Sequence, residues 1–292
     1  MTAAPLPDSP VVPAALDGSK TIRFRCHRGI ACWNACCSSI DLALTPVDIV
    51  RLKRRLGLRS GEFLAAYTLP YELEPGGITG VKLRPVEGGS ACPFVRSDGC
   101  AVYADRPTAC RYYPLALLSM RRQGESRERD AYALLREPHC LGHGAQRTLT
   151  IDAYRAEQGA AEADELARGW RQLILKKKSS GPTIGKPGAR SLQLWFMACY
   201  DVDALRAFVA GDGFQALFEL PSAELDAILA DDYAAMRFGF RLLRQVLFGE
   251  QTIALRADAA ARRRERVRAH RAELELEAAA QRADERFDED AP

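Results

Sequence analysis

The stretch that decides how this chain is organised is Cys26-His-Arg-Gly-Ile-Ala-Cys32-Trp-Asn-Ala-Cys36-Cys37, which places two of its four thiols side by side. A second set of cysteines follows at Cys92, Cys100, Cys110 and Cys140. Eight of the nine cysteines therefore lie between residues 26 and 140. Structural cysteines are usually scattered like other small apolar residues. Clustering of this kind indicates either disulfide bonds or a metal site.

The expected compartment favours metal. The first twenty residues contain four prolines and no basic segment followed by an apolar run, so they do not resemble a secretory signal. No segment has the roughly 18 uninterrupted apolar residues that a membrane span needs. We therefore expect a cytoplasmic protein with no membrane contact, in which thiols stay reduced and structural disulfides are rare. Disulfides and a redox sensor are the remaining alternatives.

Composition and motifs exclude several function classes. The formal net charge of +3 on 292 residues gives no electrostatic argument for a nucleic-acid partner. The sequence has no Rossmann fingerprint, P-loop, HExxH motif or serine-nucleophile elbow, so metal is the one cofactor that it supports. No residue is identified as catalytic.

Local signals predict several elements of the cysteine-rich half. Thr45 is a natural N-cap for a helix that ends at Gly57. A second helix is expected over 60–67 and a strand over 78–86. The turn signal at 97–99 predicts a small hairpin flanked by Cys92 and Cys100.

The remaining segments are assigned by charge and periodicity. The charged run 119–130 is expected to be an exposed excursion. Thr150 should cap a single helix that continues toward Lys176, and residues 176–189 have the composition of a linker.

We predict a mainly α protein with a small irregular metal core that contains a β-hairpin, an α+β class dominated by helices. Its parts are a disordered N-terminus (1–20), a cysteine-cluster metal-binding domain (21–145), a helical region (150–250) and a charged helical tail (256–292). The tail is basic in its first half and acidic in its second. It is expected to be a solvated helix, with binding of a protein partner as the alternative.

Eight cysteines can fill two mononuclear sites, one iron–sulfur cluster with spare thiols, or a polynuclear site, because each centre typically takes four ligands. Cys36 and Cys37 are adjacent, so their side chains point in different directions and favour two metals or a bridged centre. His139 and His143 are further potential ligands. Cys199 lies among large apolar residues and is interpreted as core. Thiolates suit zinc or iron and do not distinguish between them.

Charge supplies a second argument. A centre with four thiolates carries about −2 and needs nearby cations when it is buried. Arg106 and Arg111 flank Cys110 in the sequence and are therefore expected to contact the cofactor.

These residues resemble a known family. The sequence resembles the zinc- or iron-chelating cysteine-cluster family written CxxCxxCC, or YkgJ-type. The resemblance rests on a cysteine-rich run that ends in Cys-Cys, followed by C-P-F, G-C-x-V-Y, D-R-P-x-x-C-R-Y-Y-P and a late C-x-G. The matching positions, over about residues 24–144, include the eight cysteines, Pro93, Tyr103, Arg106, Pro107, Arg111 and Pro114. The first segment departs from the family pattern, because it reads C-x5-C-x3-C-C. That wider spacing resembles, more weakly, the cysteine segment of flagellin lysine N-methylases.

The leading hypothesis is a cytoplasmic protein that chelates zinc or iron through Cys26, Cys32, Cys36, Cys37, Cys92, Cys100, Cys110 and Cys140. One alternative is an enzyme, either an iron–sulfur oxidoreductase or a metal-dependent modifying enzyme of the lysine N-methylase kind. The other is a partner-binding module that zinc stabilises.

Overall fold

The computed structural model describes residues 11–74, 78–120, 129–179 and 187–259, together with residues 261, 264, 265, 268, 269 and 272. Among these residues, more lie in helices than in strands, and the sheets are small and antiparallel. The predicted α-dominated α+β class is therefore confirmed. Among the described residues, no helix is both long and apolar enough to cross a membrane.

The first layer of the fold consists of two helices and a small sheet. Helix α1 (Pro46–Leu56) begins at Thr45, whose side chain accepts from the Asp48 N–H, and ends at Gly57 in the left-handed conformation (φ 68°). Both ends agree with the prediction. The layer also contains α2 (Ser60–Tyr67), β3 (Ala43–Leu44), β4 (Thr68–Glu74) and β5 (Ile78–Leu83), with the strand order β3-β5-β4.

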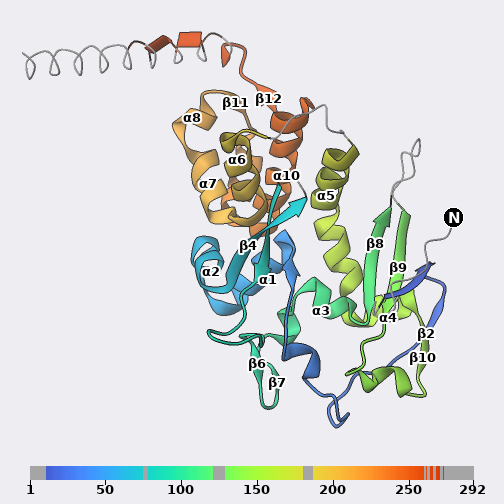
Figure 1. The fold of residues 1–292 in the computed structure, drawn as a ribbon. Helices are drawn as coiled ribbons and strands as arrows, with labels where there is room; N and C mark the ends of the chain where they lie inside the picture. The colour runs from blue at the N-terminus through green and yellow to red at the C-terminus, as the bar shows by residue number, and fades with distance from the viewer. Residues whose placement is uncertain are drawn as a thin grey trace, which may run out of the picture.

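The second group of strands lies on the other side of the molecule (Figure 1). It contains β1 (Val11–Leu16), β9 (Arg129–Leu135) and β8 (Leu115–Met120) in that order, and the pair β2 (Thr21–Arg23) and β10 (Thr148–Thr150). The expectation that residues 1–20 are disordered is wrong for β1, because its backbone pairs with the edge of β9. Residues 1–10 lie outside the described residues, as do residues 121–128 of the predicted excursion.

The helical region begins differently from the prediction. A single helix was expected from Thr150, but Gly159 adopts φ 65° and divides it into α4 (Ile151–Gln158) and α5 (Ala160–Ser179). A left-handed residue ends an α-helix, and glycine adopts that conformation without a steric cost. The later elements are α6 (Ala189–Tyr200), α7 (Val202–Ala210), α8 (Asp212–Gln215), β11 (Phe218–Glu219), α9 (Ser222–Ala230), α10 (Asp232–Phe248) and β12 (Ala254–Leu255).

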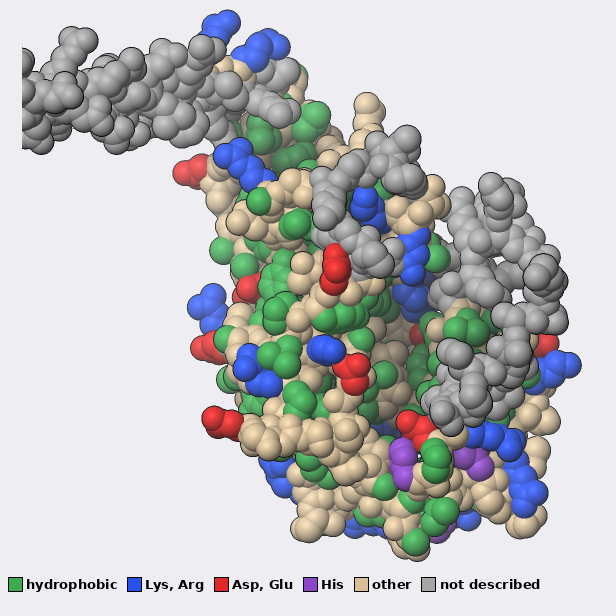
Figure 2. Space-filling view, in the orientation of Figure 1, with side chains coloured by type: hydrophobic (Ala, Val, Ile, Leu, Met, Phe, Trp, Pro, Cys, Tyr) green, Lys and Arg blue, Asp and Glu red, His purple; other side chains and the backbone are tan. Residues whose placement is uncertain are grey.

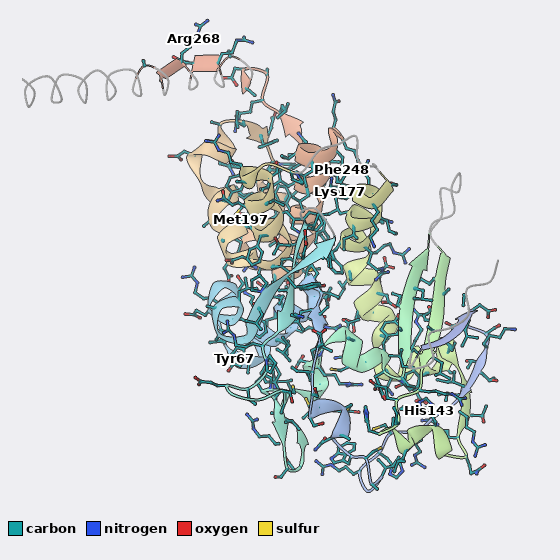
Figure 3. The ribbon with its side chains drawn as sticks, in the orientation of Figure 1. Tyr67, His143, Lys177, Met197, Phe248 and Arg268 are labelled. Carbon is teal, nitrogen blue, oxygen red and sulfur yellow. The ribbon has the colours of Figure 1, made fainter. Side chains whose placement is uncertain are left out.

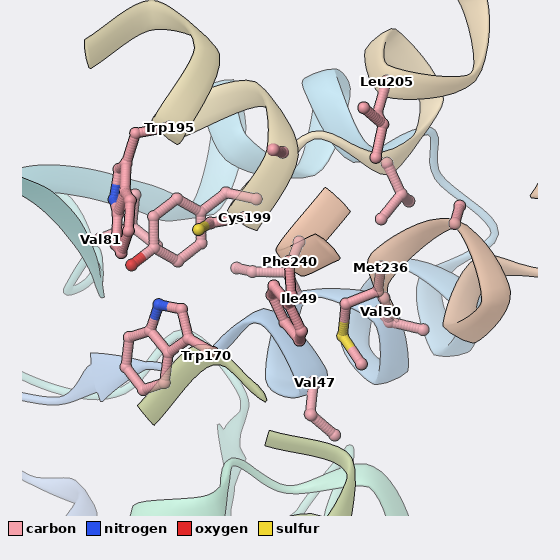
Figure 4. Close-up of a cluster of buried hydrophobic side chains, with 14 of the residues drawn as sticks. Val47, Ile49, Val50, Val81, Trp170, Trp195, Cys199, Leu205, Met236 and Phe240 are labelled. Carbon is pink, nitrogen blue, oxygen red and sulfur yellow. The ribbon is translucent and has the colours of Figure 1, made fainter. Parts of the chain in front are cut away.

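Two hydrophobic cores stabilise the molecule. The larger core joins α1, α2 and β5 to α5, α6, α7 and α10. Figure 4 shows Cys199 in this core with Trp170, Trp195 and Phe240. Cys199 is 1% exposed, which confirms its interpretation as a core residue. The smaller core lies between β2, α3 (Thr108–Tyr112), β8, β9 and α4.

A buried charge network ties α1 to the later helices. The Lys53 ammonium lies 3.0 Å from an Asp203 oxygen and 3.1 Å from an Asp232 oxygen. The Arg206 guanidinium contacts the same Asp232 oxygen at 2.7 Å. Each buried charge therefore has a partner of opposite sign, which burial of a charge requires. Most of the predicted tail (256–292) lies outside the described residues.

Candidate metal centre

All eight clustered cysteines line one cavity of about 220 Å³. The cavity lies between the two cores, because its wall includes Phe24 and Tyr154 from the smaller core and Phe94 and Val102 from the larger one. All eight are free thiols, and Cys199 is not part of the wall. The two cysteine segments therefore converge on one place, while the number of metal ions stays a prediction.

Cys26 and Cys140 are brought together by backbone pairing at the edge of the smaller core. The N–H of Arg25, next to Cys26, donates to the Gly142 carbonyl at 3.1 Å. A Cβ on Gly142 would lie 2.6 Å from the Phe24 ring, so only glycine permits this approach. The Leu141 N–H also donates to the Cys32 sulfur at 3.3 Å. The loop that follows Cys140 thus holds two other cysteines in position.

The Cys36-Cys37 pair lies on η1 (Ala35–Cys37), a single 3₁₀ turn that follows Asn34 in the left-handed conformation. The two sulfurs are 4.0 Å apart. The Cys92 N–H donates to the Cys37 carbonyl at 2.8 Å, which attaches the second cysteine segment to the first. This hydrogen bond accounts for the convergence of residues that are far apart in the sequence.

Cys100 and Cys110 come from two further elements. The predicted hairpin is present as β6 (Val95–Arg96) and β7 (Gly99–Cys100), and it carries Cys100. Cys110 lies on α3, which is held at its first residue by Asp48. One Asp48 oxygen accepts from the Thr108 N–H and hydroxyl at 2.7 Å each. The other accepts from the Thr45 N–H and hydroxyl, so one carboxylate joins α1 to the helix of Cys110.

The thiols lie in surroundings that oppose ionisation of several cysteines together. Desolvation by the surrounding atoms, then the neighbouring thiols, raises the pKa of Cys26 to about 11 and that of Cys110 to about 12. Cys110 is open to the cavity, yet protein atoms surround it on most sides. A hydrogen bond from Cys37 lowers the pKa of Cys36 to about 7 and raises that of Cys37. A bound cation reverses this repulsion, which makes the cavity suitable for a positive ion.

The two predicted arginines have different positions. Arg106 lines the cavity, where its charge opposes the rise in the Cys26 pKa. It also donates to Gln158 at 2.7 Å. Arg111 is buried behind the wall, and its guanidinium donates to the backbone carbonyls of Ala104, Arg106 and Gln158. Arg111 therefore fixes the loop before α3 and the end of α4.

The two histidines also differ. His139 lines the cavity next to Cys140, and its ring lies 3.6 Å from the Glu137 carboxylate. His143 packs against the Phe24 ring, with 5.2 Å between the ring centroids, and is not part of the wall. Figure 3 shows His143 at the end of the molecule that lies away from α10. Of the two, His139 alone borders the thiols.

The donor chemistry of the cavity fits a thiophilic metal. Soft thiolates select zinc, iron–sulfur clusters and similar centres. Within the part of the chain that the structure describes, no three His, Cys, Asp or Glu side chains are arranged to hold one ion.

Asp48 is the residue that sequence reasoning underestimated. It is not among the site residues predicted from the sequence, although burial and the four hydrogen bonds make it the anchor of Cys110. Burial raises the pKa of its carboxyl, and the hydrogen bonds from Thr108 and Thr45 oppose that rise. The local signal Thr45-x-x-Asp48 predicts the helix cap, and nothing in it indicates Thr108.

Comparison with known proteins supports the cysteine cluster. Residues 25–141 match the family model CxxCxxCC, described as "Putative zinc- or iron-chelating domain". No curated protein and no solved structure matches the chain. The matched range begins one residue before Cys26 and ends one residue after Cys140, so it contains all eight clustered cysteines and the turns that carry them. Over residues 25–141, the cysteine-cluster part of this chain is similar to the CxxCxxCC family.

Proposed function

We propose that this protein binds zinc or iron through the eight clustered cysteines. The observation that carries the proposal is the cavity lined by all eight thiols, which come from loops, a turn, a 3₁₀ turn, a strand and a helix. Chains rarely collect free thiols in one place without a chemical role, and the family description gives the same metals.

The arrangement favours two ions or one bridged centre, including an iron–sulfur cluster. The thiols that raise the Cys26 pKa are Cys36, Cys32 and Cys140, whereas those that raise the Cys110 pKa are Cys92, Cys36 and Cys100. Cys36 thus acts electrostatically on both Cys26 and Cys110. A side chain that is shared by two groups of thiols is what a bridged or paired centre requires.

Residues of the chain have separate roles in this proposal. Arg106 offsets the negative charge of the thiolates from the cavity wall, and the Leu141 N–H stabilises the Cys32 sulfur. Arg111 and Asp48 position the helix of Cys110. When bound, zinc supplies structural cross-linking, and an iron–sulfur centre supplies electron transfer.

The test is anaerobic purification followed by metal analysis and an absorption spectrum. Zinc or iron should be present at one or more ions per chain, and absorption near roughly 400 nm identifies iron bound to thiolate and sulfide. Cys110→Ala should lower the metal content. Cys199→Ala is the matched control, because that thiol lies in the apolar core, and its metal content should equal the wild type.

Hydrogen exchange of residues 24–40 in Cys110→Ala tests whether the centre is composite. If both cysteine segments bind the same centre, hydrogen exchange of residues 24–40 should increase in this variant. The variant should also lose more metal than the removal of a single ligand would explain. Full protection with half of the metal retained contradicts a composite centre. Metal loss in Cys199→Ala, or a metal-free wild type, contradicts the assignment of the eight ligands.

A further inference from the structure

A second, larger cavity adjoins the cysteine cavity. Its volume is about 650 Å³, and it shares the side chains of Cys36, Ile40, Leu42, Ala109, Tyr113 and His139 with the first. Figure 2 shows this region as a recess beside strands β8 and β9. The volume lies within the roughly 300–1,000 Å³ of sites for small organic molecules. The cysteine centre and this cavity are therefore separated by a single layer of side chains.

The wall of the second cavity is mostly apolar. Ile40 and Leu42 precede α1 and line one part, and Leu115 and Leu117 of β8 line another. Such a surface favours the apolar body of a ligand, because burial removes apolar area of both partners from water. The charged and ionisable groups on the wall are Asp41, Glu137, His139, Asp164 and Arg171, and such groups set the orientation of a ligand in a mostly apolar site.

Arg171 on α5 is the cation of this cavity whose hydrogen-bonding capacity is least used. Its side chain is 14% exposed, and its Nη1 lies 3.5 Å from an Asp164 oxygen. The other Asp164 oxygen is 2.7 Å from the Arg155 guanidinium and also accepts from the Tyr112 hydroxyl. Arg155 therefore pairs with Asp164 and also, at 3.1 Å, with an Asp152 oxygen. Among the described residues, the buried Nε of Arg171 has no hydrogen-bond partner.

The other charged groups on the wall have partners or lie in water. Asp41 is 81% exposed and pairs with Lys82 at 2.8 Å. Glu137 lies beside His139 at the end next to Cys36. The Arg171 end is thus the part of the cavity that holds a guanidinium with an unused, buried N–H. A guanidinium with an unused N–H binds a carboxylate through directed, charge-assisted hydrogen bonds.

We propose that the second cavity binds a small organic carboxylate with an apolar body, whose anionic group pairs with Arg171 and whose other end reaches the wall shared with Cys36. This inference goes beyond metal binding and does not depend on it. Its position places the bound molecule beside the cysteine centre, where a substrate of that centre would lie.

The experiment is a fluorescence titration of the full-length protein, as purified, with 8-anilinonaphthalene-1-sulfonate, an apolar anion that fluoresces when it leaves water. Saturable binding of one molecule per chain is expected. Octanoate should displace the probe at a concentration at least tenfold lower than octanol, because the two differ only in the anionic group. If octanol displaces the probe at the same concentration as octanoate, the proposed role of the positive charge is wrong. This comparison uses the wild-type protein and does not depend on the folding of a variant.

Variants locate the binding. Arg171→Met keeps the length of the side chain and should weaken binding of the probe roughly tenfold or more, since a charge-assisted pair is lost. Arg168→Met is the matched control on the same helix, because Arg168 is exposed and pairs with Glu165, and its affinity should stay within twofold of the wild type. Ala43→Trp introduces a large ring from an exposed position on the wall and should abolish binding. Wild-type affinity in Arg171→Met or Ala43→Trp overturns the proposal.

Discussion

The helical core and the cysteine region are stabilised by different means. The helical core contains long helices such as α5 and α10, and its side chains include Trp195 at 2% and Leu205 at 0% exposure. The cysteine region has strands of two residues and 3₁₀ turns, held by backbone hydrogen bonds and the Asp48 carboxylate. Apolar burial is the main stabilisation of the first region, whereas the second depends more on precise polar contacts.

This difference has a physical consequence for metal binding. A region with little apolar area of its own gains much of its stability when ligands far apart in the chain are fixed by an ion. A region with a large hydrophobic core does not need such an ion for its stability. The two regions share side chains in the larger hydrophobic core, so the helical core serves as the fixed support for the cysteine loops.

The largest effect is expected from Trp195→Ala, which removes a buried ring of the helical core. The change should lower the free energy of unfolding by about 4 kcal/mol, because it leaves a cavity and an unpaired Thr79 carbonyl, which accepts from the Trp195 ring at 3.1 Å. Urea denaturation measures the loss. Leu229→Ala, at a side chain that is 42% exposed, is the control and should cost less than about 1 kcal/mol. If Trp195→Ala and Leu229→Ala lower the free energy of unfolding by similar amounts, the core around Trp195 is not the main source of stability.

A smaller effect is expected from Asp48→Asn in the cysteine region. An amide has only one oxygen to accept with, so the loss should be about 2–3 kcal/mol. Exchange of the amides in 106–112 should rise, and metal content should fall. Asp152→Asn is the control, because Asp152 is an acid in the first turn of α4 that is 63% exposed. This variant should change neither the amide exchange of 106–112 nor the metal content. Unchanged exchange around Cys110 in Asp48→Asn would show that Asp48 does not anchor α3.

The smallest effect is expected in the pH dependence of the free energy of unfolding, through Asp203 in the helical core. Burial opposes ionisation of Asp203, but hydrogen bonds from Ser60 and Lys53 outweigh it and lower its pKa from 3.8 to about 2. A lowered carboxyl pKa contributes stability that is present above the unfolded value and is lost as the pH falls through the folded value. Stability should therefore decrease by about 2 kcal/mol between roughly pH 4 and pH 2 through this group.

Urea denaturation across that pH range tests the assignment. Asp203→Asn should remove most of the slope that this group causes, because the amide does not titrate. Asp226→Asn, at an exposed position on α9, is the control and should keep the wild-type slope. The idea is rejected when Asp203→Asn titrates like the wild type.

Features set by neighbouring residues were predictable from the sequence. The cap at Thr45, the end of α1 at Gly57 and the hairpin before Cys100 depend on contacts within a few residues, and all three are present. The break at Gly159 was missed, although the glycine is visible, because helical periodicity continues on both sides of it.

Contacts between distant residues were not predictable. Asp48 and Thr108 are 60 positions apart, and no local pattern links them. β1 was missed because its proline-containing sequence favours disorder, whereas an open edge of β9 was available to pair with it. The second cavity depends on Arg171 of α5 facing strands and loops from the other half of the chain, and an arginine on a helix gives no such indication.

The wall shared by the two cavities has a thermodynamic consequence. Cys36 and His139 border both spaces, so any displacement of these side chains by an occupant of one space alters the other. By linkage, the factor by which an ion changes the affinity for an organic anion equals the factor by which that anion changes the affinity for the ion. If both proposed occupants bind, the affinity for the anion should therefore change with the metal loading of the thiols, through side chains that border both spaces.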